Sequence, residues 1–340
     1  MSRTERLHAD LERGFAALEA GELDTASSIV ERCRRIDRKN PDVVALAAAV
    51  ADASGDTEDA LAQYRLLREL RPDDPMPIIC IARLELQAQD DPDAALDTLA
   101  AAFDFIDEEA DLIEAIYVKA QALIVRGEPA AAREALGELA SSAIDDGDLA
   151  LDLAEVALSA EDPDAARRWI EVARGRPELA ADALHLLGRV HEATGDRAAM
   201  IAAWQEVRRL DLAAAPGGPG ALAISEDDLE QIALQTLAEL PDDIREKLER
   251  VPILIDDVPS EALVADGLDP RLLGLFQGTP MPEDGALAAT VTNILLFRGN
   301  LARACADAEH LAEEIRITVL HETAHYFGLD EEDLEALGLD

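Results

Sequence analysis

The chain has 340 residues, enough for two or more domains with cores of their own. Acidic residues outnumber basic ones 72 to 30, which gives a formal charge of −42. A field of that sign repels nucleic acid and anionic membrane surfaces, so we expect neither as a partner, whereas a basic protein or peptide is compatible with it. Alanine and leucine dominate the apolar residues and aromatic residues make up only 3%, a composition that favours helices packed closely on helices.

The cysteines and the apolar segments indicate in which cellular compartment the protein is expected. Cys33, Cys80 and Cys305 are scattered, odd in number and form no CxxC pair, so we predict small buried residues in a reducing compartment. The start of the chain has no apolar segment of the signal-peptide kind, and no apolar run approaches the roughly 20 residues that span a bilayer. The sequence therefore predicts a cytoplasmic protein.

A short phrase recurs through the first 210 residues. It reads GELDTA at 21, GDTEDA at 55, DDPDAA at 90, GEPAAA at 127, EDPDAA at 161 and GDRAAM at 195. The starts are 34, 35, 37, 34 and 34 residues apart. A period near 34 is typical of helix–turn–helix arrays, and residues 7 to 212 resemble tetratricopeptide repeats.

Small residues flank these turns at fixed places, seven before and five after the start of the phrase. The pairs are Gly14 with Ala26, Ala48 with Ala60, Ala120 with Ala132, and Ala154 with Ala166. Small side chains there let paired helices approach closely. Arg83 in the third unit and Met200 in the sixth break this rule, so we expect distortion in those two units.

About six such units form an α-solenoid, in which each unit buries its apolar face only against its neighbours. The resemblance to tetratricopeptide repeats implies a concave face that binds peptides or protein partners. The alternative is a spacer or dimerisation scaffold without such a groove.

The segment AAAPGGPG (213–220) cannot continue a helix and marks a domain boundary. We predict a repeat domain over 1–212, a linker over 213–224 and a small α+β domain over 225–340. In the last domain we expect a serine-capped helix over 225–240, strands within 251–259, 272–278 and 292–299, and a final helix from about Ala306.

The final helix carries the motif H-E-x-x-H. His321 and His325 are four residues apart, so they lie one turn apart on one helix face, where both imidazoles can bind one metal ion. Glu322 is placed to accept a proton from a metal-activated water, the role of the glutamate in H-E-x-x-H metallopeptidases. Tyr326 is a candidate oxyanion donor, with core packing as the alternative role.

A third ligand is expected just after this helix. Gly328 allows the chain to turn back, and the spacing H-E-x-x-H-x-x-G-x-x-E points to Glu331. The competitors are Asp330 and Asp333. Glu314 lies seven residues before His321, about 10 Å along the helix axis at roughly 1.5 Å per residue, and is a poorer candidate.

Four ordered segments extend the similarity beyond the motif: LAELPDDIREKLERVPILIDDVP, LLGLFQG, NILLFRGNL and IRITVLHETAHYFGLDEEDL. With them, residues 225 to 335 resemble a bacterial family of minimal zincin-like metallopeptidases. The resemblance implies zinc on His321 and His325, Glu322 as general base, and a strand beside the site, NILLFRG, that pairs with an extended peptide. Members of the family more often carry aspartate where this chain has Glu331.

The sequence thus predicts a zinc-dependent peptidase preceded by a repeat scaffold that binds a partner or presents a substrate. The alternative is a non-catalytic interaction protein whose zinc site is structural or silent. Such a site would be closed by a fourth protein ligand.

Overall fold

The computed structural model describes residues 2–213, 222, 224–240, 242–248, 251–278, 293–305 and 307–327. The chain divides into two compact units, Met1–Ala173 and Arg174–Asp340, which we treat separately. Most of the predicted linker lies outside the described residues. The predicted division into 1–212, 213–224 and 225–340 therefore stays a prediction.

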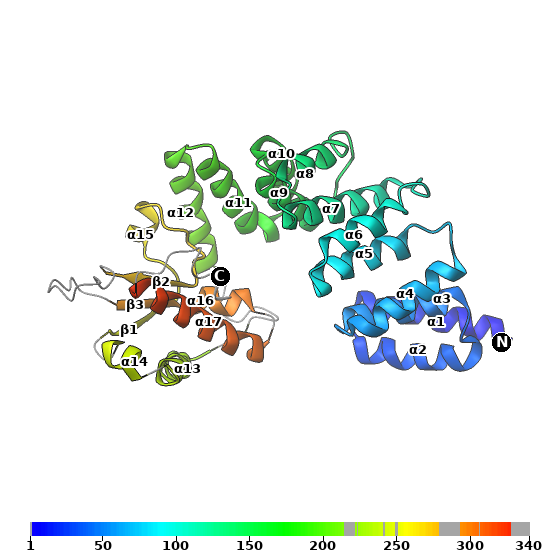
Figure 1. Cartoon of the computed structure of the whole chain (residues 1–340), viewed down its shortest axis with the longest axis horizontal. Coiled ribbons are helices and arrows are strands. Elements are labelled where there is room, and N and C mark those ends of the chain that lie inside the picture. Colours follow the sequence, from blue (N-terminus) through cyan, green and yellow to red (C-terminus); the bar gives the residue numbers. More distant parts are fainter. Residues whose placement is uncertain are drawn as a thin grey trace. The chain divides into compact units, whose positions relative to one another are not determined.

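The first unit consists of helical hairpins that follow one another along the chain (Figure 1). Their helices are α1 (Arg3–Glu19), α2 (Leu23–Asp37), α3 (Pro41–Ala53), α4 (Thr57–Leu70), α5 (Met76–Gln89), α6 (Pro92–Ala100), α7 (Glu109–Val125), α8 (Pro129–Gly137), α9 (Gly147–Ser159) and α10 (Pro163–Arg174). The second helix of each hairpin also packs on the first helix of the next. This is the solenoid that the period of 34 predicts, and the mainly helical fold class is confirmed.

The recurring phrase begins each hairpin turn with a left-handed residue. Gly21, Gly55, Gly127 and Gly195 have φ between 72° and 77°, and in the two phrases without glycine Asp90 has φ 51° and Glu161 has φ 57°. Left-handed backbone is costly for residues with a β carbon. The turn geometry is thus kept across the array even where the sequence does not favour it.

The small residues on either side of the turns lie where the helices of a hairpin cross. Ala26, Ala48, Ala60, Ala120, Ala132, Ala154 and Ala166 have no exposed surface. At Gly14 an added β carbon would come within 2.4 Å of Leu46 Cδ2. Arg83, which breaks the pattern, forms an ion pair with Asp52 of α3. The third hairpin still closes, through the fully buried Ala82 and Ala95.

The cysteines are free: Cys33 and Cys305 are buried and Cys80 is half-buried. None of the helices in the described ranges has the length and apolar character required to cross a bilayer.

The second unit contains the sixth hairpin and an α+β region (Figure 1). Its elements are η1 (Pro177–Leu179), α11 (Ala180–Ala193), α12 (Arg197–Ala213), α13 (Glu226–Ala238), α14 (Asp242–Leu248), β1 (Ile253–Asp256), α15 (Glu261–Ala265), β2 (Gly274–Gln277), β3 (Asn293–Phe297), α16 (Arg298–Ala304) and α17 (Ala308–Tyr326). The three predicted strands and the capped helix near 225–240 are present, with Ser225 accepting a hydrogen bond from the backbone of Asp228.

The strands form one sheet in the order β1-β3-β2. β1 pairs with β3 in parallel, Ile253 opposite Ile294, and β2 pairs with β3 antiparallel, Gly274 opposite Leu296. The prediction that NILLFRG pairs with an extended peptide is therefore wrong, because β3 is the central strand and both its edges are taken. The strand at the sheet edge that lies beside α17 is β2.

Helices α13 and α17 cover one face of this sheet. Leu229 and Ala233 of α13 pack with Ile294 and Leu296 of β3, and α17 adds Leu311, Ile315 and Val319 at successive spacings of four. A spacing of four keeps these side chains on one face of the helix. This apolar core fixes the rotation of α17 and with it the direction of the side chains at its end.

The sixth hairpin, α11–α12, packs on the α+β region. Gly188 leaves room for Trp204, because a β carbon on it would come within 2.0 Å of Trp204 Nε1. Met200 and Trp204 then form a buried cluster with Val264 of α15. Met200 breaks the small-residue rule because its side chain fills a contact that the earlier hairpins do not make.

Polar contacts reinforce this packing. Arg271 donates to Asp182 of α11 (2.5 Å) and with two nitrogens to Asp211 of α12 (3.1 and 3.2 Å). His185 Nε2 lies 2.9 Å from both carboxylate oxygens of Asp269. Although burial works in the opposite direction, the hydrogen bond from His185 lowers the pKa of Asp269 below its ordinary value, and Arg271 adds to the effect. The segment that leads into β2 is thus held by the last repeat.

Candidate metal site

Helix α17 brings the three motif residues to one end of the sheet. Asp307 caps the start of the helix by accepting hydrogen bonds from the backbone of Glu309 and His310. The helix runs unbroken to Tyr326, so His321, Glu322 and His325 lie in its last two turns. The prediction that these residues share one helix is confirmed.

The two histidines converge. Their Nε2 atoms are 3.0 Å apart, and the rings meet edge to face with centroids 4.7 Å apart and planes at 79°. Both side chains are partly exposed. Two neutral imidazoles in this arrangement either share one proton between the facing nitrogens or direct both lone pairs at a cation.

The separation fits zinc. Imidazole nitrogens bind zinc at about 2.0–2.1 Å, so two ligands of a tetrahedral site lie roughly 3.3 Å from each other. The observed 3.0 Å is close to that value. Neutral imidazole is also a donor that zinc favours, so the pair fits the metal in chemistry as well as in spacing.

Glu322 lies between α17 and the sheet. Its side chain is only 6% exposed, and its Oε2 accepts a hydrogen bond of 2.5 Å from the backbone N–H of Phe276 in β2. Buried carboxylates need such donors. The bond fixes one carboxylate oxygen against the strand.

The register of β2 explains why Phe276 is available. Leu273 accepts a hydrogen bond of 2.8 Å from the backbone of Phe297 in β3. In an antiparallel pair the residues that bond to the partner alternate with residues whose backbone groups point away. Gly274 and Phe276 are of the second kind, so their backbone groups point away from β3, and the N–H of Phe276 meets Glu322.

Gly274 lets α17 approach this strand. A β carbon at this position would come within 2.6 Å of Thr318 Cγ2 and 2.9 Å of Glu322 Cγ. Contacts that short are excluded, so glycine is required for the observed placement of Glu322. Gly274 and the backbone of Phe276 were not predicted to take part in the site, although a glycine within LLGLFQG is a signal for close approach.

The predicted third ligand, Glu331, and its competitors lie outside the described residues. Gly328, Asp330, Glu331 and Asp333 all do, as do Met281 and the side chain of Tyr326, so Glu331 stays a prediction. Across the ranges that the structure describes, no cluster of three His, Cys, Asp or Glu side chains is arranged to hold a metal ion. His310, near the start of α17, is exposed.

Comparisons with known proteins match the two regions separately. Residues 248–339 match the family described as zincin-like metallopeptidase, and residues 17–76 match the tetratricopeptide repeat. Both resemblances seen in the sequence are therefore confirmed. A search of curated proteins gave no match.

Among solved structures, the repeats are similar in fold to tetratricopeptide proteins. PilW, described as a type IV pilus biogenesis factor, aligns with a TM-score of 0.52 and 16% identity over 63% of this chain and 95% of its own. The pilF protein of Pseudomonas aeruginosa aligns with a TM-score of 0.50 and 18% identity over 62% of this chain and 94% of its own. At these identities the likeness shows the fold alone.

Proposed function

We propose that the second unit is a zinc-dependent peptidase. The observation that carries the proposal is the convergence of His321 and His325 to 3.0 Å beside the buried carboxylate of Glu322. The match of residues 248–339 to zincin-like metallopeptidases supports the same reaction class.

His321 and His325 would hold the metal through Nε2, and Glu331 would complete the ligand set, with Asp330 and Asp333 as its competitors. When bound, zinc polarises a carbonyl and lowers the pKa of water to about 7. The carboxylate of Glu322 accepts a proton from the attacking water and passes it to the nitrogen of the leaving amine. Tyr326 stays a candidate donor to the oxyanion.

The sheet edge offers a place for the substrate. The outward backbone of β2 runs past Glu322, and Phe276 binds its carboxylate. An extended peptide can add to such an edge through its outward groups other than the N–H of Phe276, which would bring the peptide backbone to the reacting groups. Pairing with a substrate peptide, the role predicted for NILLFRG, is thus proposed for GLFQ of β2.

The repeats would bind a protein partner or present a substrate, and we propose a cytoplasmic location, with which the free cysteines accord. The match to tetratricopeptide repeats supports the interaction role in general and names no partner.

The first experiment is metal content by mass spectrometry, on protein purified without chelator or metal-affinity resin. We expect about one zinc per chain in the wild type. His325→Ala should lose it, whereas His310→Ala, at an exposed position of the same helix, should retain it. No metal in the wild type would contradict the proposal.

The second experiment separates binding from catalysis. Glu322→Gln should retain zinc and lose peptide hydrolysis by about 100-fold or more, because it removes the proton acceptor. A metal-loaded wild type that cleaves no member of a peptide library would favour the non-catalytic interaction protein.

A further inference from the structure

The negative charge of the chain is unevenly distributed. The first 40 residues hold eight basic and eight acidic residues, so the whole formal charge of −42 arises from the other 300. The first hairpin, α1–α2, is therefore chemically unlike the rest of the chain. Its surface thus lacks the net negative charge that would repel an anionic partner at short range.

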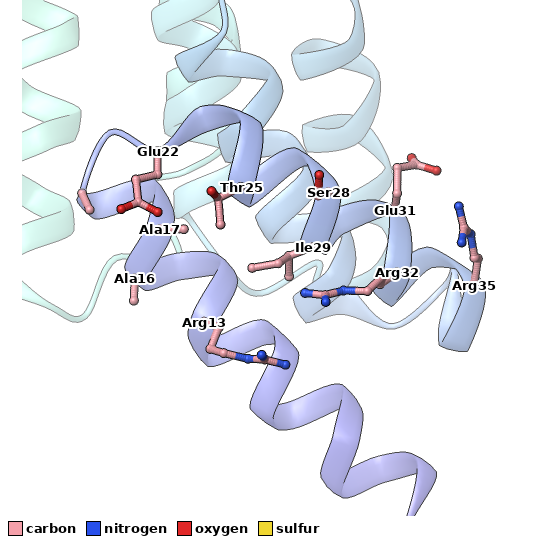
Figure 2. Close-up of a pocket in the computed structure, with 11 residues that line it drawn as sticks. Arg13, Ala16, Ala17, Glu22, Thr25, Ser28, Ile29, Glu31, Arg32 and Arg35 are labelled. Atoms are coloured by element: carbon pink, nitrogen blue, oxygen red, sulfur yellow. The ribbon is translucent and has the colours of Figure 1, made fainter.

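A groove of about 890 Å³ lies between α1 and α2 (Figure 2). We call it the α1–α2 groove. Ala16, Ala17 and Ala20 of α1 and Ile29 of α2 line it with small or apolar side chains. Ala17 and Ile29 are buried in the core of the hairpin, whereas Ala16 and Ala20 are exposed. The floor of the groove is thus apolar and open to solvent.

Arginines border this floor. Arg13, Arg32 and Arg35 line the groove, as do Glu22 and Glu31, which leaves an excess of one positive charge. In Figure 2 the guanidinium groups of Arg13 and Arg32 extend along the space between the two helices, with Arg35 beyond them. All three side chains are exposed and can reach a ligand.

The positive charges of two of these arginines are partly neutralised by an acidic side chain. Arg13 and Arg32 both approach Asp10, which lies 3.7 Å from Arg32. For Arg35, no carboxylate within the described residues comes to ion-pair distance. A carboxylate from a partner would therefore meet Arg35 without displacing an existing ion pair.

The next hairpin shows what such a face accommodates. One period of 34 residues later, Arg13 and Ala16 correspond to Ala47 and Val50 of α3. Ala47 and Val50 are buried, 3% and 6% exposed, in a core that they share with α1 and α2. In the second hairpin, this face of α3 therefore packs against α1 and α2. The first hairpin has the corresponding face on α1, where Arg13 stands in place of Ala47.

We propose that the α1–α2 groove binds an acidic helix of a partner protein, with small or apolar side chains against Ala16 and Ala20 and carboxylates toward Arg32 and Arg35. A second copy meeting the same face would bring arginine against arginine. Nucleic acid carries phosphates along its whole length and would meet the −42 charge of the chain as well as the groove.

The test uses the full chain and a fluorescein-labelled 18-residue helical peptide with one stripe of Ala and Leu and Glu at the remaining positions. The matched probe has Gln in place of Glu. Anisotropy is measured at 150 mM salt, where the Debye length of about 8 Å screens the distant acidic residues. We expect the Glu peptide to bind at least fivefold tighter than the Gln peptide.

Variants then locate the site. Arg35→Gln should weaken binding of the Glu peptide about three- to fivefold, and Arg32→Gln with Arg35→Gln tenfold or more. Ala20→Trp should block the groove. Arg38→Gln, on the same helical end but outside the groove, should change nothing. Circular dichroism should match the wild type, since all four positions are exposed.

Three results would overturn the proposal: equal affinity for both peptides, Glu-peptide binding unchanged in the double arginine variant, or no binding at 1 mM peptide. A dimer of the wild type that Ala20→Trp converts to a monomer would assign the groove to a second copy instead. None of these results bears on zinc content or hydrolysis.

Discussion

Gly274 and Glu322 are in contact across the gap between β2 and α17, with no space for a side chain between them. A β carbon on Gly274 would lie 2.9 Å from Cγ and 3.1 Å from Oε1 of Glu322. The position of the proposed general base therefore depends on the absence of a methyl group on the neighbouring strand.

Gly274→Ala should displace Glu322 and lower kcat/KM for peptide hydrolysis about tenfold to 100-fold, since small misplacements of reacting groups are costly. Zinc content should stay at the wild-type level, because the atoms nearest to a β carbon on Gly274 belong to Thr318 and Glu322 and not to either histidine. Gly137→Ala, at a helix position where a β carbon meets nothing within 4 Å, is the control. Unchanged hydrolysis in Gly274→Ala would remove the strand from the mechanism.

Arg271→Gln should destabilise the second unit by about 2–4 kcal/mol, because it removes both hydrogen bonds of Arg271 to Asp211, whose side chain is 6% exposed. Among the described residues Asp211 then keeps one ion-pair partner, Arg303 at 3.5 Å. Arg209→Gln removes an exposed ion pair with Glu206 on the same helix and should cost less than about 1 kcal/mol. Urea denaturation of both variants measures the difference. Equal urea midpoints for the two variants would show that the contacts of Arg271 with α11 and α12 contribute little to stability.

A fragment of residues 174–340 should fold, whereas a fragment of residues 225–340 should not reach the same stability. The shorter fragment exposes Val264 and removes the partners of Asp269 and Arg271. Thermal unfolding followed by circular dichroism compares the two. If they melt at the same temperature, the boundary at 213–224 predicted from the sequence describes the folding units better.

Glu161→Gly should stabilise the first unit by about 0.5–1 kcal/mol, because Glu161 has φ 57° and a β carbon is strained there. Its ion pair with Arg133, 3.5 Å long and largely exposed, is a small loss. Glu161→Ala loses the same ion pair and keeps the strain, so it should not be stabilising. A higher melting temperature for Glu161→Ala than for Glu161→Gly would show that the left-handed backbone at this position is not strained by a β carbon.

Lowering the pH from neutral should at first raise the stability of the first unit, through protonation of Glu114 on α7. Burial raises the pKa of this carboxyl above its ordinary value of 4.5, and Asp152 adds to the rise while Arg83 opposes it. The folded state then binds a proton more tightly than the unfolded state. Stability rises as the pH falls through the raised pKa, and the gain is complete below 4.5.

Glu114→Gln should therefore raise the melting temperature at pH 7 and remove this part of the gain on acidification. Glu58→Gln, at an exposed position of α4, serves as the control. Scanning calorimetry at pH 7 and pH 5 measures both. A lower melting temperature for Glu114→Gln at pH 7 would mean that the charge of Glu114 stabilises the fold.

The local parts of this fold could be predicted from the sequence. The phrase and its left-handed turn occur six times at a period near 34, and Leu311, Ile315 and Val319 give α17 an apolar face that leads to the two histidines. Short helices such as α15 (Glu261–Ala265) were not predicted, because one turn of helix leaves little periodic signal.

Strand order depends on pairing between distant segments, so it does not follow from the pattern of one segment. NILLFRG is the strand expected to pair with a peptide, yet NILLF is buried at every position. An uninterrupted apolar run is typical of a central strand, and the glycine in LLGLFQG is the better indicator of the strand against α17. The packing of the last hairpin was also missed, although Met200 in place of a small residue was its signal.

Arg271 and Phe276 lie five residues apart on the segment that joins the last repeat to the proposed site. Arg271 is bound to α11 and α12, and the amide of Phe276 is bound to Glu322. A segment this short opens as one cooperative unit. The exchange rate of a single amide hydrogen, that of Phe276, thus reports how firmly the last hairpin, α11–α12, holds the segment that leads into β2.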